Sequence, residues 1–143
     1  MIRKLILLTL FCGILNNLHS QEEQLRITTL SDSLINNSGA SKLIFTDNIE
    51  EAKKLALEDI KKNVPFLLIN GGFAPSFSID QIKFEEKYKI FYYRFGCSAP
   101  KENIIETYNF VILDYIKRTY GKNCVDMISK DVFEFKKWKK ISQ

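Results

Sequence analysis

Two short loops carry the residues best suited to chemistry, and each begins with glycine and ends in an Ala-Pro pair. They span residues 71–75 and 96–100. Each loop follows a predicted strand and precedes a predicted helix, so in a parallel sheet both would lie at the carboxyl edge. Ligands of open α/β sheets bind beyond that edge, where the free amides of helix N-termini favour anions. The loop residues expected near a ligand are Gly71, Gly72, Gly96, Cys97 and Ser98.

Arg94 directly precedes the second loop. Its permanent charge and its fork of N–H donors could hold a carboxylate or a phosphate beside the loop amides. The alternative is that the glycines and prolines only turn the chain, while Arg94 pairs with a carboxylate of the fold. A small anionic ligand is therefore one expectation, and a purely structural role is the other.

Cys97 is the one candidate nucleophile, because Arg94 and the following helix N-terminus could favour its thiolate. No residue of the sequence is identified as its base. Cys97 could instead form a disulfide with Cys124, or both could stay unpaired thiols. Glu85 and Glu86 do not form a catalytic pair, since adjacent helical residues do not face one another.

The first twenty residues predict an export signal. Arg3 and Lys4 are followed by an apolar run over residues 5–15, which is shorter than the roughly 20 residues that span a bilayer. Polar residues then lead to Ser20, a small residue suited to the position before a cut. We expect cleavage between Ser20 and Gln21, and a periplasmic or secreted protein without a transmembrane anchor.

Cleavage would remove His19, the only histidine of the chain. Mechanisms that use a Ser-His-Asp or Cys-His arrangement are then excluded, as are the common catalytic zinc sites. The sequence has no calcium-binding loop and no phosphate-binding loop of the Gly-x-x-x-x-Gly-Lys type. We expect no metal and no cofactor.

The remaining 123 residues suit one domain and carry 19 basic and 17 acidic residues. A net charge of +2 gives no basic stripe of the kind that binds nucleic acid, so no nucleic-acid partner is expected. Residues 21–40 form a polar leader with a short strand or helix, and residues 41–143 form a single α/β domain. Short continuous apolar runs at residues 43–45 and 66–69, and a segment rich in aromatic residues at 90–95, predict buried strands.

Helical spacing and cap residues place helices between and after these strands. Asn48 or Asp47 precedes a helix whose predicted buried face holds Ile49, Ala52, Ala56 and Ile60. Ser78 and Gln81 form a capping box, and a long apolar stripe begins at Ile104 and ends before Gly121. The element order β-α-β-α-β-α-α predicts a small three- or four-stranded parallel or mixed sheet flanked by helices.

Several short motifs of the last two thirds of the chain resemble small exported proteins of the Bacteroidota, a group of bacteria. They are Phe-Glu-Glu-Lys-Tyr at residues 84–88, Phe-Gly-Cys-Ser-Ala-Pro at 95–100, Tyr-Gly-Lys at 120–122 and the terminal Trp138. The Ser20-Gln21 site is also similar to export signals of that group. The resemblance implies export and the extent of the domain, and it brings no assigned activity.

The C-terminal residues 133–140 mix aromatic side chains with four lysines. Such a segment could bind a membrane surface or a polyanion. We favour the alternative in which Phe135 and Trp138 close the core while the lysines stay in water.

The sequence thus favours an exported binding or interaction domain, whose partner is an unknown protein or a small anionic ligand. A thiol-dependent or other histidine-free enzyme that uses Cys97 is the second hypothesis. A structural protein associated with the cell envelope is the third.

Overall fold

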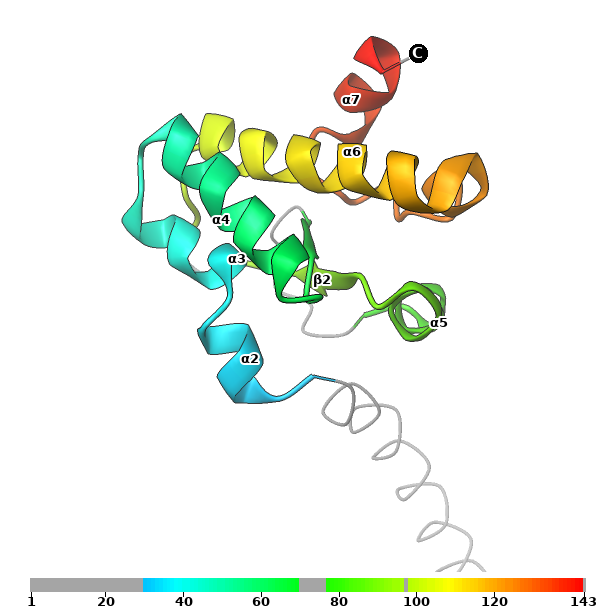
Figure 1. The fold of residues 1–143 in the computed structure, drawn as a ribbon, viewed down its shortest axis with the longest axis horizontal. Helices are drawn as coiled ribbons and strands as arrows, with labels where there is room; N and C mark the ends of the chain where they lie inside the picture. Colours follow the sequence, from blue (N-terminus) through cyan, green and yellow to red (C-terminus); the bar gives the residue numbers. More distant parts are fainter. Residues whose placement is uncertain (1–29, 70–76, 97, 143) are drawn as a thin grey trace, which may run out of the picture. The chain divides into compact units, whose positions relative to one another are not determined.

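The computed structural model describes residues 30–69, 77–96 and 98–142. Its elements in chain order are α2 (Asp32–Asn36), α3 (Gly39–Lys42), the 3-10 helix η1 (Leu43–Phe45), α4 (Ile49–Lys61), β1 (Phe66–Leu68), α5 (Ile79–Tyr88), β2 (Phe91–Tyr93), α6 (Glu102–Val125) and α7 (Phe135–Ile141) (Figure 1). The predicted mixture of helices and strands is confirmed.

The sheet of the described residues has two strands, not the predicted three or four. β1 and β2 pair in parallel, with Phe66 opposite Phe91 and Leu68 opposite Tyr93. The chain passes from one strand to the other through α5. All three residues of β1 are buried, as a continuous apolar strand predicts.

The predicted strand at residues 43–45 is wrong, because this segment forms η1. Only Leu43 is buried, whereas 46% of Ile44 and 85% of Phe45 are exposed. A strand covered on both faces would bury all three residues. A run of three apolar residues has no periodicity that separates a strand from a helical turn.

α4 begins after Asn48, whose side-chain oxygen accepts a hydrogen bond from the backbone N–H of Glu50 at 2.8 Å. Its buried residues are Ala52, Leu55, Ala56 and Asp59, and this face packs on α6. Ile49 was predicted on the buried face, but it is 42% exposed because it occupies the first helical position.

α6 carries the longest apolar stripe of the chain, and its core includes Ile104, Ile105, Ile112 and Ile116. The helix begins at Glu102, so Pro100 precedes it by two residues. The sequence predicted that the helix ends at Gly121; instead Gly121, with φ 73° and ψ −171°, interrupts it, and the chain then resumes helical geometry up to Val125. Glycine adopts such a φ without steric cost.

The N-terminal helices α2 and α3 belong to the same compact unit as the rest of the described chain, which spans Asp32–Gln143. The predicted polar leader therefore contains helix within this unit, and Ser38, Gly39 and Ala40 are buried. Gly39 permits this packing, because a Cβ there would lie 2.4 Å from the backbone oxygen of Leu55. α3 can approach α4 so closely only with glycine at this position.

α7 places its aromatic residues in the core, as favoured from the sequence. Phe135 and Trp138 are 5% and 2% exposed. Among the described residues, no helix is both long enough and apolar enough to cross a membrane.

Candidate functional site

The structure places Arg94, Gly96 and Ser98 directly after β2, at the carboxyl end of the parallel pair. Arg94 is half-buried, whereas Gly96 and Ser98 are exposed. A Cβ on Gly96 would meet no atom within 4 Å, so the backbone there is open to approach. The other predicted site residues, Gly71, Gly72 and Cys97, lie outside the described residues.

The Arg94 guanidinium lies over an aromatic ring. Its central carbon is 5.0 Å from the centroid of Phe77, which stacks in turn against Tyr92 at 6.5 Å. Such stacking orients the planar guanidinium. No signal in the sequence links Phe77 to Arg94.

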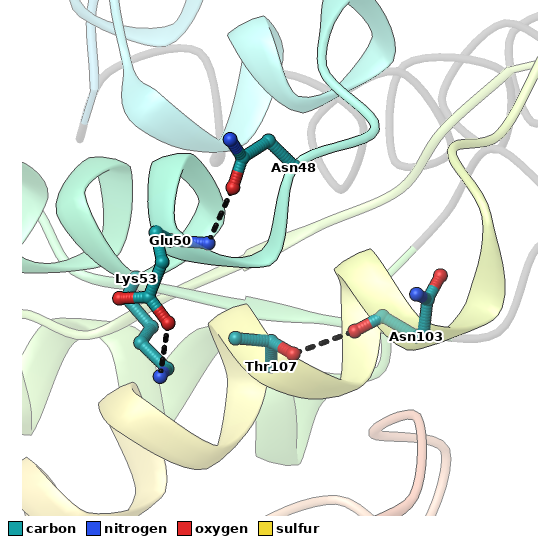
Figure 2. A network of polar contacts seen from close by, with 5 residues as sticks. All are labelled: Asn48, Glu50, Lys53, Asn103 and Thr107. Atoms are coloured by element: carbon teal, nitrogen blue, oxygen red, sulfur yellow. Dashed lines mark hydrogen bonds and ion pairs between the residues drawn. The ribbon is translucent and has the colours of Figure 1, made fainter.

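The N-terminal ends of α4 and α6 lie next to one another. Lys101, which precedes α6, forms an ion pair with Asp47, which precedes the cap of α4, at 3.2 Å. Figure 2 shows the first turns of both helices, with Asn48 at the cap of α4, Glu50 and Lys53 in α4, and Asn103 and Thr107 in α6. The chain runs from β2 through residues 94–101 into α6, so the start of α6 is the next helix N-terminus along the chain after Arg94.

These helix starts differ in whether a side chain already caps them. In α5, the Ser78 oxygen accepts from the N–H of Gln81, and the Gln81 side chain accepts from the N–H of Ser78. Asn48 caps α4 in a similar way. Lys101 makes no side-chain cap for α6, so no side chain of that residue competes for its first amides.

A buried asparagine fixes the outer edge of β1. The side chain of Asn109 accepts from the N–H of Leu68 at 2.8 Å and donates to the carbonyl oxygens of Leu68 and Phe133 at 2.9 and 3.0 Å. The N–H of Phe133 also donates to the Leu68 oxygen at 2.9 Å. A side chain of α6 and the segment around Val132 thus occupy the position of a third strand.

A second buried group joins three helices. The Asp59 carboxylate accepts from the backbone N–H groups of Gly39 and Ala40 at 2.7 and 3.0 Å and from the hydroxyl of Tyr108 at 2.6 Å. The Tyr108 oxygen accepts in turn from the N–H of Phe66. Burial raises the pKa of Asp59, and these hydrogen bonds oppose the rise. Asp59 and Tyr108 are fully buried, so this arrangement stabilises the packing of the three helices.

Glu85 completes the outer edge of β2, since its carboxylate accepts from the N–H of Tyr92 at 2.7 Å. Glu85 is 2% exposed, whereas Glu86 is exposed. The expectation that these two carboxylates do not converge is confirmed. The sequence did not predict the structural roles of Glu85, Asp59 and Asn109. The one sequence signal that could have indicated these roles is the presence of a polar residue on an otherwise apolar helix face.

Cys124 is a buried free thiol. Burial raises the pKa of its thiol to about 11, which disfavours the thiolate at neutral pH. No disulfide is found at Cys124 in the structure, and because Cys97 lies outside the described residues, a bond between the two in the oxidised protein stays a prediction. Within the described ranges, no three His, Cys, Asp or Glu side chains are grouped to hold a metal ion.

Comparison of the chain with protein-family models, with curated proteins and with solved structures gave no match.

Proposed function

We propose that this chain is an exported binding domain that holds a small anionic ligand at the carboxyl edge of β1 and β2. The observation that carries the proposal is the placement of Arg94. It follows β2 directly, stacks on Phe77, and lies one residue before the buried Phe95 and two before the exposed Gly96. A fixed cation supported by a rigid ring is suited to orienting a carboxylate or a phosphate.

Two further features support the proposal of an anion site at this edge. The α6 start lacks a side-chain cap, so its first amides can donate to an anion. The side chain of Ser98, which is exposed, adds a hydroxyl donor in the loop between Arg94 and α6. An interaction module is favoured over an enzyme, because the mature chain would have no histidine to act as a base for Cys97.

Substitution of Arg94 tests the proposal. Arg94→Met keeps much of the stem that packs on Phe77 and removes the charge, while Arg94→Lys keeps the charge and removes the planar fork. Phosphate, sulfate and a set of small carboxylates would be tested by the shift in melting temperature and by calorimetry. We expect binding to weaken by about 1.5–3 kcal/mol in Arg94→Met, with the fold intact. A variant that loses stability while its anion binding is unchanged would make Arg94 a structural residue.

Export is tested separately by sequencing the N-terminus of protein recovered from its native host. Because the charged start, the apolar run and the small residue at Ser20 are all present, the mature chain should begin at Gln21. An exported protein that retains Met1 would contradict the proposed cleavage.

A further inference from the structure

Positive charge is concentrated in the C-terminal part of the chain. Residues 117–142 contain eight Lys or Arg and three Asp or Glu, whereas residues 32–116 contain ten and twelve. Charges within about 10 Å of one another act together at moderate salt. The end of α6 and α7 therefore carry the excess positive charge of this unit.

The exposed side of α7 gathers part of this charge on one face. Phe135 and Trp138 are turned into the core, which leaves two rows of residues, spaced four apart, toward solvent. One row is Lys136 and Lys140, and the other is Lys137 and Ile141. These four residues are called the α7 face below.

Two ion pairs hold α7 in place, and one of them involves Lys137, so two of the three lysines of the α7 face keep an unneutralised charge. Lys137 pairs with Glu106 of α6 at 2.7 Å, and Lys139 pairs with Asp126 at 3.2 Å. Within the described chain, neither Lys136 nor Lys140 forms an ion pair with an acidic side chain. Lys117 of α6 donates to the carbonyl oxygen of Ser142, which brings another positive charge to the end of α7.

We propose that the α7 face binds the anionic headgroups of a membrane surface. Ile141 distinguishes a lipid surface from other polyanions, since it is 67% exposed and lies in the same row as Lys137. An apolar side chain among lysines can enter the headgroup boundary while the ammonium groups contact phosphates. The buried Phe135 and Trp138 do not contact the membrane. The association is therefore peripheral and weakens as the salt concentration rises.

Vesicle sedimentation tests this proposal. The purified protein and its variants, all with the same N-terminus, are mixed with phosphatidylcholine vesicles that contain or lack phosphatidylglycerol. Lys136→Gln with Lys140→Gln removes two charges from the α7 face. Lys53→Gln with Lys54→Gln, on α4, removes the same charge elsewhere and serves as the control.

We expect binding to the anionic vesicles only, and a loss of about 30-fold in the α7 variant, because each lysine near the surface contributes about fivefold. The control should bind nearly as well as the parent protein, and Ile141→Ser should weaken binding several-fold. Circular dichroism checks that each variant is folded. Equal losses in both lysine variants would attribute the binding to net charge and overturn the proposal. So would binding of soluble polyphosphate as tightly as of the vesicles, which would make the face a general polyanion site.

Discussion

The side chain of Asn109 accepts a hydrogen bond from the N–H of Leu68 and donates one to its carbonyl oxygen. A side chain of α6 thus makes the hydrogen bonds that a neighbouring strand would make with the edge of β1. Both residues are fully buried, and water cannot replace these bonds. A two-stranded sheet normally leaves two open edges. Here Asn109 closes one, and Glu85 closes the other through Tyr92.

The Asn109→Ala variant should be strongly destabilised. It would leave the buried N–H of Leu68 and the carbonyl of Phe133 without this partner, and each such loss costs about 1–3 kcal/mol. We expect the free energy of unfolding to fall by about 3 kcal/mol in chemical denaturation. Asn103→Ala, at an exposed position of the same helix, is the control and should change it by less than about 0.5 kcal/mol. Equal effects of the two substitutions would contradict this role of Asn109.

Tyr108→Phe should separate the hydrogen bonds of the hydroxyl from the packing of the ring. The hydroxyl donates to Asp59 and accepts from the N–H of Phe66, so the variant removes one of the three hydrogen bonds to the Asp59 carboxylate and the bond to the buried Phe66 N–H. A hydrogen bond to a charged group contributes about 1.5–3 kcal/mol, so a loss in that range is expected.

Tyr93→Phe is the matched control for this variant. The Tyr93 ring packs against Phe66 and Phe95, and within the described residues its hydroxyl has no hydrogen-bond partner. Its removal should be nearly neutral. Combining Tyr108→Phe with Asp59→Asn then gives a double-mutant cycle, and additive losses would show that the two side chains are not coupled.

Cys124 should react slowly with alkylating reagents in the folded protein. Because the pKa of its thiol is raised from 9.0 to about 11, its thiolate fraction at pH 8 is about 100-fold lower than that of an ordinary thiol. The same shift means that the stability it contributes is complete below about pH 9 and is lost as the pH rises through about 11.

Mass spectrometry of the peptides that contain Cys124 and Cys97, after alkylation with and without urea, measures this protection separately for each thiol. Slow labelling of Cys124 that becomes fast in urea is the expected result. If Cys124 is labelled in urea only after reduction, it is in a disulfide, and the free buried thiol is refuted.

Local signals predicted several elements well. The Ser78–Gln81 capping box, the Asn48 cap and the long stripe of α6 each depend on residues close in the sequence, and the structure has all three. The number of strands depended on distant residues instead. The outer edge of β1 is filled by Asn109 and by the segment near Val132, which no periodicity of β1 itself can indicate.

In the candidate site, too, features set by residues close in the sequence could be predicted better than contacts between distant residues. The sequence predicted Arg94 within a strand at residues 90–95, whereas in the structure β2 ends at Tyr93 and Arg94 directly follows it. Arg94 contacts Phe77, which precedes α5, whereas Arg94 itself follows β2. This contact therefore depends on how α5 packs on β2. A pattern of residue types along the chain carries no information about that packing.

Trp138→Ala should lower the free energy of unfolding by about 3 kcal/mol, since truncation of a buried aromatic leaves a cavity. The indole N–H also donates to the Asp114 carboxylate at 2.8 Å, and its loss removes a link between α7 and α6. Trp138→Phe keeps most of the ring volume and deletes this donor, so it should cost less. Ile141→Ala, at an exposed position of the same helix, should be nearly neutral. Denaturation curves followed by circular dichroism would measure all three. Unchanged stability in Trp138→Ala, together with lost vesicle binding, would place the indole at a membrane surface and refute its assignment to the core.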